Sequence, residues 1–380
     1  MTDILRPDTP PSPTVEDLHE RLSLLKGKCA AMRENIVHQR SQFMNATLPS
    51  LATDLRPISS TPLKVRHKLK GHRGKINSCD WASNSQYVLS VAMDGLALMW
   101  DAYSSLKSRV FLLPSCYVLS CALPPSCGYL ASGGLDNRVS IHSMTQSADE
   151  TDPSVPYGSG SSTRMKGLTK SEPMAILKGH SAYVADLCFL TDQQIISASG
   201  DMTCCIWDVN TGRRVSTLYD HLGDVSSVTK HPSKMQIVAT ASNDKTVKIW
   251  DLRIARCVQT FQGHNKDVTS VDFFPDGNAV LSGGDDSTAR LFDMRTDCQM
   301  NIYSAPDIMS PVNSVAVTPS GRIMFCGHDT GEVVAWDTIK CTYLGPITKH
   351  LGPVTKVKVS PDGVGVLSSS WDETMTVLSL

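Results

Sequence analysis

Five histidines in this sequence each precede an aspartate by 21 to 23 residues. A histidine held by a carboxylate can act as a general base. A buried carboxylate needs hydrogen-bond donors, however, and a histidine, a serine and a tryptophan ring nitrogen can supply them together. Because the pair recurs five times, we interpret its members as parts of a repeated structural network. The pairs are His72–Asp94, His180–Asp201, His221–Asp244, His264–Asp286 and His350–Asp372.

The repeat that contains these pairs has a regular length. Five segments end in an aromatic residue followed by aspartate: Trp100-Asp101, Trp207-Asp208, Trp250-Asp251, Phe292-Asp293 and Trp336-Asp337. Degenerate endings at His142 and Leu378 complete a series of seven, with successive intervals of 42, 65, 43, 42, 44 and 42 residues. This is the period of a four-stranded propeller blade. Residues 63–380 therefore resemble the WD-repeat family, and we predict an all-β, seven-bladed β-propeller.

Other markers fall at fixed places in the repeat. Asp136 takes the aspartate position of the second repeat, whereas Asp329 of the sixth lies one residue early. A serine stands two residues before the aspartate at Ser199, Ser242 and Ser370, and we expect it to join the network. We assign Trp100, Trp207 and Trp250 to the same structural role.

The remaining composition excludes several function classes. The chain has 36 basic and 37 acidic residues, so no long-range attraction to nucleic acid or an anionic membrane is expected. The N-terminus has no secretory signal, and the twelve cysteines, scattered apart from the adjacent Cys204 and Cys205, are typical of reduced cytosolic thiols. No phosphate-binding glycine loop or metal-ligand spacing occurs. We therefore expect no enzymatic activity, catalytic residue, cofactor or metal.

The pattern also divides the chain. We expect residues 1–13 to be disordered, 14–44 to form a coiled-coil helix, 45–62 to be a linker and 63–380 to be the propeller. The last repeat lacks a fourth strand, and the alternating segment 63–69 can supply it and close the ring. The long interval contains a polar insertion at 145–173, which we place as a flexible excursion between blades two and three. Two interpretations of this insertion are open: a surface insertion without a function, and a regulated docking or phosphorylation loop.

The N-terminal helix has a heptad pattern. Thr14 and Asp17 predict its start as a capping box. Apolar residues then repeat at spacings of three and four, which predicts a coiled-coil seam. The flanking positions are mostly basic, which disfavours self-pairing and favours an acidic partner helix. The alternative is a helix that packs on its own propeller. The seam residues are Val15, Leu18, Leu22, Leu25, Cys29, Met32 and Ile36.

A coiled-coil arm that leads directly into a seven-bladed propeller resembles the G protein β subunit family. Segments 120–137, 197–204, 273–295 and 369–372 are similar to that family's blades. The resemblance implies an obligate dimer with a small lipidated γ subunit, binding of GDP-bound α subunit and then of downstream effectors on one propeller face, and transduction of receptor signals. It also implies a cytoplasmic location, peripheral at the inner face of the plasma membrane through lipidated partners.

The resemblance also assigns the residues that face the α subunit and effectors. Four of these residues lie three positions after a strand-entry histidine and form an arc on one rim: Lys75, Tyr183, Asp224 and Asp267. Carboxylates on this arc would steer a basic partner helix. Tyr117, Asn77, Ser226 and Thr269 depart from the family's usual Trp, Tyr, Met and Asn. A generic WD-repeat scaffold, such as a ubiquitin-ligase or ribosome-associated adaptor, is the alternative function. The assigned residues are Lys75, Lys107, Tyr117, Leu119, Leu135, Asn137, Ser181, Tyr183, Asp224, Asp267, Asp285 and Trp371.

Overall fold

The computed structural model describes residues 15–43, 55–56, 58, 63–144, 168–169, 172–305 and 308–379. The predictions for 1–13, and for most of 45–62 and 145–173, lie outside these residues. The chain divides into two compact units, 1–51 and 52–380. The first contains the helix α1 (Val15–Phe43), and the predicted capping residue Thr14 lies outside the described residues. The side chains of α1 from residue 20 to residue 35 are exposed, so they are available to a partner.

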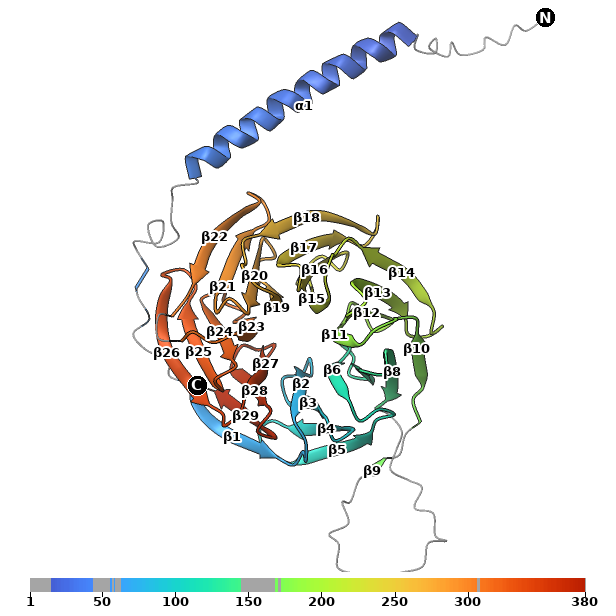
Figure 1. The fold of residues 1–380 in the computed structure, drawn as a ribbon, viewed down its shortest axis with the longest axis vertical. Helices are drawn as coiled ribbons and strands as arrows, with labels where there is room; N and C mark the ends of the chain where they lie inside the picture. The colour runs from blue at the N-terminus through green and yellow to red at the C-terminus, as the bar shows by residue number, and fades with distance from the viewer. Residues whose placement is uncertain are drawn as a thin grey trace, which may run out of the picture. The chain divides into compact units, whose positions relative to one another are not determined.

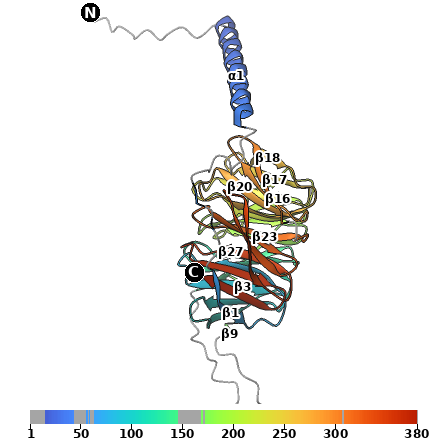
Figure 2. The same ribbon diagram turned by 90° about the vertical axis from the view of Figure 1, so that its left-hand side faces the viewer.

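The second unit is a ring of seven sheets, antiparallel except for the short strand β9 (Leu168–Thr169), which confirms the predicted propeller (Figure 1). Figure 2 shows the same ring of strands edge-on. We number the sheets as blades 1 to 7 in the order of their innermost strands. Six sheets have four strands and one has five. The innermost strands lie around the centre, and each blade continues outward from them (Figure 1).

The strands of the first four blades follow one another in sequence, apart from β9. Blade 1 contains β2 (Ile76–Trp81), β3 (Tyr87–Ala92), β4 (Leu96–Asp101), β5 (Lys107–Leu112) and β9 (Leu168–Thr169). Blade 2 contains β6 (Val118–Ala122), β7 (Tyr129–Gly134), β8 (Arg138–Ser143) and β10 (Ala175–Lys178). Blade 3 contains β11 (Val184–Phe189), β12 (Gln194–Ser199), β13 (Thr203–Asp208) and β14 (Arg214–Tyr219). Blade 4 contains β15 (Val225–Lys230), β16 (Ile237–Ser242), β17 (Thr246–Asp251) and β18 (Arg256–Gln262).

The last three blades complete the ring. Blade 5 contains β19 (Val268–Phe273), β20 (Ala279–Gly284), β21 (Ala289–Asp293) and β22 (Cys298–Tyr303). Blade 6 contains β23 (Val312–Val317), β24 (Ile323–His328), β25 (Glu332–Asp337) and β26 (Thr342–Lys349). Blade 7 contains β27 (Val354–Val359), β28 (Gly365–Ser370), β29 (Thr374–Ser379) and β1 (Lys64–Lys70).

Blade 7 shows how the ring closes. Its outermost strand, β1, comes from the start of the propeller and pairs antiparallel with the C-terminal strand β29, from Lys64 opposite Ser379 to Lys70 opposite Thr374. Figure 1 shows β1 beside β29 at the blue-to-red junction. The predicted closure is therefore confirmed. It leaves no unpaired edge between the two ends of the propeller, because each end supplies hydrogen bonds to the other.

Glycines set the spacing between some neighbouring blades. A side chain at Gly133 of blade 2 would meet Val184 of blade 3, since a Cβ there would lie 2.7 Å from a Val184 methyl carbon. Gly327 of blade 6 has the same relation to Val354 of blade 7, at 2.6 Å. The valines that begin the innermost strands can therefore pack directly on the second strand of the preceding blade.

The insertion lies at a different place from the one predicted. The strands β8 and β10 are hydrogen-bonded neighbours in one sheet, so residues 144–174 connect the third and fourth strands of blade 2. The excursion is therefore within blade 2, not between blades two and three. Near its end, β9 pairs in parallel with β5 of blade 1, with Leu168 opposite Val110. The repeat spacing could not reveal this, because it counts from the third strand of each blade.

Candidate functional site: the rim of the strand-entry histidines

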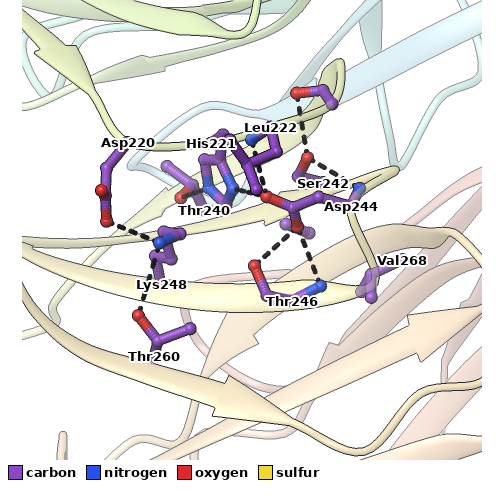
Figure 3. Close-up of polar contacts among 12 residues, drawn as sticks. Asp220, His221, Leu222, Thr240, Ser242, Asp244, Thr246, Lys248, Thr260 and Val268 are labelled. Atoms are coloured by element: carbon purple, nitrogen blue, oxygen red, sulfur yellow. Dashed lines mark hydrogen bonds and ion pairs between the residues drawn. The ribbon is translucent and has the colours of Figure 1, made fainter.

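Blade 4 contains the whole repeated network, and Figure 3 shows its contacts among His221, Leu222, Thr240, Asp244 and Thr246. The Nδ1 of His221 lies 2.7 Å from an oxygen of Asp244, and its Nε2 lies 2.7 Å from the hydroxyl of Thr240. The ring nitrogen of Trp250 donates to the same hydroxyl at 2.8 Å. Asp244 also accepts from the backbone of Leu222 and from both the backbone and the hydroxyl of Thr246. The loop before the innermost strand is thereby tied to the turn between the second and third strands.

The same network recurs in four other blades. Histidine Nδ1 to aspartate distances lie between 2.8 and 3.1 Å in blades 1, 3, 5 and 7. Blades 1 and 3 add the tryptophan, whereas blade 5 has Phe292 packed beside the histidine and has no ring nitrogen to offer. The hydroxyl partners are Ser90, Ser197, Ser282 and Ser368.

One part of the predicted network is wrong. The hydroxyl that contacts the histidine comes from the residue four positions before the aspartate, not two. In blade 4 this residue is Thr240, whereas Ser242 donates to the carbonyl of Gly223 at 3.0 Å and accepts from the backbone of Asp244. Both residues have the same strand parity, so sequence spacing did not separate them. Ser199 and Ser370 bond in the same way as Ser242.

The geometry supports a structural role for these histidines. Their side chains are only 0 to 1% exposed, so a substrate could not reach the ring nitrogens. Both nitrogens are also occupied by protein partners. Burial raises the pKa of Asp244, but hydrogen bonds from His221, Thr246 and the Leu222 backbone outweigh it, and the pKa lies well below its usual range. Hydrogen bonds from the equivalent partners lower the pKa of Asp201 and of Asp286 in the same way.

These shifts predict a specific acid sensitivity. A carboxylate whose pKa is lowered by folding stabilises the folded state above its unfolded pKa of about 4, and this stability is lost as the pH falls toward the folded value. We expect the urea midpoint of the chain to fall steeply below about pH 4. Asp201→Asn should be less stable at neutral pH and should show a shallower fall in acid. An unchanged pH slope in this variant would contradict the assignment.

The rim that carries these loops also carries most residues assigned to the α subunit and effectors. Several contact one another across blades. The ammonium of Lys75 lies 4.0 Å above the ring of Trp371, and the hydroxyl of Tyr183 donates to Asp224 at 2.8 Å. The Asn137 amide donates to the carbonyl of Ser181 at 3.2 Å. These residues thus form an ordered arc before any partner binds.

The other assigned residues differ in position. Tyr117 and Leu135 are joined through their backbones at 3.0 Å and are 58% and 52% exposed. The backbone of Asp285 donates to that of Asp267 at 2.9 Å, and Leu119 is half-buried on β6. Lys107 does not lie on a rim loop. It belongs to the outer strand β5, where its ammonium donates to the carbonyl of Gly71.

Three of the four departures from the family pattern have a structural explanation. Asn77, Ser226 and Thr269 are each the second residue of an innermost strand, and each donates to a backbone carbonyl of the next blade. Asn313 and Thr355 do the same in blades 6 and 7. These side chains therefore join neighbouring blades. The sequence signal is a small polar residue one position after the valine or isoleucine that begins the strand.

The centre of the ring contains a second polar region. Lys356 of blade 7 contacts Asp186 of blade 3 at 3.1 Å. A cavity of about 360 Å³ is lined by these two residues and by Asp80, Lys230 and Lys358 among others. Burial lowers the pKa of Lys358, but Asp80, Asp272 and Asp186 outweigh it and raise the pKa. The lysines and aspartates that line this cavity therefore offset one another's charge. The Lys356–Asp186 ion pair also links blade 7 to blade 3.

The described residues contain no group of three His, Cys, Asp or Glu that could hold a metal ion. Within the same residues, no helix has both the length and the apolar character needed to cross a membrane.

Comparison with known proteins settles the family. A family model described as G protein beta WD-40 repeat protein matches residues 19–379. The chain belongs to the G protein β family. Its relatives include guanine nucleotide-binding protein subunit beta-5b of Danio rerio, 36% identical and covering 87% of this chain and 80% of that protein. The subunit beta of Zea mays is 34% identical, over 96% of this chain and 97% of that protein. The subunit beta of Saccharomyces cerevisiae is 29% identical, over 96% of this chain and 92% of that protein.

The solved structures support the fold of this G protein β family member. The WD40 β-propeller domain of Doa1 superposes with a TM-score of 0.70 at 23% identity, over 84% of this chain and 97% of that domain. Members of the G protein β family and other WD40 propellers are non-enzymatic scaffolds. The buried His–Asp pairs tie the loops of this rim to the turns between the second and third strands of their blades.

Proposed function

We propose that this chain is the β subunit of a heterotrimeric G protein. The observation that carries the proposal is the ordered arc on one rim, where Lys75 and Trp371, Asn137 and Ser181, and Tyr183 and Asp224 are paired across blades. A preformed surface loses little side-chain entropy when a partner binds, which favours affinity.

The arm is proposed to pair with a small γ subunit. Leu22, Leu25, Cys29 and Met32 are exposed on α1, and an apolar seam in water favours a partner helix. The basic flanks favour an acidic helix. Val15, Leu18 and Ile36 continue the same heptads. The βγ dimer would then be obligate, because neither seam is covered without the other.

The rim arc is proposed to hold the GDP-bound α subunit. Trp371, Tyr117 and Leu135 offer exposed aromatic and aliphatic anchors, while Asp224, Asp267 and Asp285 offer charges for orientation. Binding of GTP would change the shape of the α segment and remove these contacts, which couples release to the nucleotide. Downstream effectors would then use the freed arc. The complex would be cytoplasmic and would reach the inner face of the plasma membrane through its lipidated partners.

The proposal is tested by affinity capture from native lysate. The full chain and a form that lacks residues 1–40 are compared, each with GDP or a non-hydrolysable GTP analogue. We expect a small acidic coiled-coil protein that requires the arm and a GTPase that is released by the GTP analogue. Partners that are indifferent to both the arm and the nucleotide would instead support a generic WD-repeat scaffold.

Trp371 supplies the sharpest single test of the arc. Its ring is 41% exposed below the ammonium of Lys75. Interface tryptophans often contribute about 2–4 kcal/mol, so Trp371→Ala should weaken capture of the GDP-bound α subunit by about 30-fold or more. Tyr103→Ala is the matched control, since Tyr103 is 66% exposed in the β4–β5 turn. Equal losses in both variants, measured by surface plasmon resonance, would argue against the arc.

A further inference from the structure

The central cavity lies toward the rim opposite the strand-entry loops. Each innermost strand begins at the strand-entry rim, so its last residues and the turn that follows it lie toward the other rim. Such residues line the cavity, among them Trp81, Phe189 and Lys230, which end β2, β11 and β15. The volume of about 360 Å³ falls within the roughly 300–1,000 Å³ typical of small-molecule sites. Ligand binding here is independent of the proposed α-subunit arc.

An ion pair forms the inner end of the cavity. Asp186 and Lys356 are each the third residue of an innermost strand, and they lie nearer the strand-entry rim than the other residues that line the cavity. The Lys356 ammonium contacts the two carboxylate oxygens of Asp186 at 3.2 and 3.1 Å. The cavity is therefore bounded, on the side of the strand-entry rim, by a contact between blades 7 and 3.

The carboxylates that line the cavity already have donors. Asp186 also accepts from the Ser227 hydroxyl at 2.9 Å and from the backbone amide of the next residue at 3.1 Å. The two oxygens of Asp80 accept from the backbone amides of Trp81 at 3.1 Å and Leu123 at 3.0 Å. A cation in the cavity would find these oxygens engaged and would face three ammonium groups. The arrangement therefore disfavours a cationic ligand.

Two lysines, in contrast, have unused donors. The Lys230 ammonium donates to the carbonyl of Phe189 at 2.8 Å, which occupies one of its three N–H groups. The half-buried Lys358 has no acceptor for its ammonium among the described residues. Burial lowers the pKa of Lys358, but nearby carboxylates, chiefly that of Asp80, outweigh burial and keep the ammonium charged. Charged donors that are partly withdrawn from water and lack acceptors favour an anionic ligand.

The walls of the cavity near the opposite rim are apolar and stiff. Pro124, Pro232 and Pro361 come from the turns that follow β6, β15 and β27. Trp81 lies beside them in the lining, and its ring nitrogen donates to the carbonyl of Lys358 at 3.2 Å, which fixes the indole. A ligand that combines an anionic group with a compact apolar body therefore matches both parts of this cavity.

We propose that this cavity binds a small phosphate ester. A phosphate monoester carries close to two negative charges and three acceptor oxygens, which suits two ammonium groups better than a single carboxylate does. Its phosphate oxygens would accept from Lys230 and Lys358. Its organic part would pack against Trp81 and the three prolines.

The test is isothermal titration calorimetry of the full chain. The probes are phenyl phosphate, inorganic phosphate and benzyl alcohol, which carry both parts of the ligand, the anion alone and the apolar part alone. We expect phenyl phosphate to bind at least tenfold more tightly than either of the others. Lys358→Met and Lys230→Met should each weaken phenyl phosphate binding at least tenfold. Lys234→Met is the matched control and should change binding less than twofold, since Lys234 is exposed in the turn after β15 and does not line the cavity.

A second measurement uses the unmodified chain, so it does not depend on the folding of a variant. Cys188 lines the cavity, whereas Cys298 is half-buried on the outer strand β22. Phenyl phosphate should slow alkylation of Cys188 by iodoacetamide at least threefold and leave that of Cys298 unchanged, as measured by peptide mass spectrometry. Equal binding of phenyl phosphate and benzyl alcohol, undiminished binding by both cavity-lysine variants, an equal loss in Lys234→Met or an unprotected Cys188 would each overturn the proposal.

Discussion

Replacing Leu22 and Leu25 with aspartate is expected to abolish pairing with the γ-type partner. The two leucines occupy consecutive seam positions of α1 and are 53% and 60% exposed in the isolated chain. Loss of a buried leucine costs about 2–5 kcal/mol, and a buried unpaired carboxylate costs more. The double variant should therefore lower the affinity by more than about a thousandfold. Size-exclusion chromatography of the co-expressed subunits measures this loss directly.

Leu24 provides a matched control for the same charge. It lies between the two seam leucines and is 60% exposed, but it belongs to a position outside the seam. Leu24→Asp should keep the partner, and its circular dichroism should show the same helix. Equal loss in both variants would mean that helix stability, not the seam, decides pairing. If the double variant instead lowers the thermal stability of the chain without any partner, the helix packs on its own propeller.

The propeller itself could be predicted because its signals are local and repeated. An Asp, an aromatic residue and a His at nearly constant spacing fix the strands of most blades, and seven repeat endings, separated by 42 to 44 residues in five of six intervals, fix the number of blades. The closure of the ring could be predicted because the last repeat lacks a fourth strand after Val377. The segment before His72 has the alternating side-chain pattern of a strand and can supply it. The pairing of Lys70 with Thr374 bears this out.

Other features depend on contacts between residues far apart in the sequence, and spacing does not encode them. The short strand β9 joins blade 1 after an excursion from blade 2, which only the sheet topology reveals. The contact of Lys356 with Asp186 crosses from blade 7 to blade 3. Asn77, Ser226 and Thr269 were noted only as departures from a family pattern, because their bonds to the next blade require the curvature of the ring.

The candidate site shows the same division. The rim position of Tyr183 and Asp224 could be predicted, since both follow a strand-entry histidine by three residues. Their hydrogen bond could not, because they belong to different blades.

Asp244→Ala is expected to be among the most destabilising substitutions on this rim. The carboxylate accepts from His221, from the backbones of Leu222 and Thr246 and from the Thr246 hydroxyl. Its removal leaves buried donors without partners, each costing about 1–3 kcal/mol. We expect the free energy of unfolding to fall by about 3–5 kcal/mol, measured by urea denaturation at neutral pH.

Asp136 is the control, because it occupies the same repeat position in blade 2, which has no strand-entry histidine. It accepts a backbone bond from Arg138 at 3.3 Å, and Pro114 stands at the strand-entry position. Asp136→Ala should therefore cost about 1 kcal/mol or less. The difference between the two variants isolates the histidine-linked network from the turn that both share. Equal costs would place the stability in the turn alone, and the buried His221 would then need another explanation.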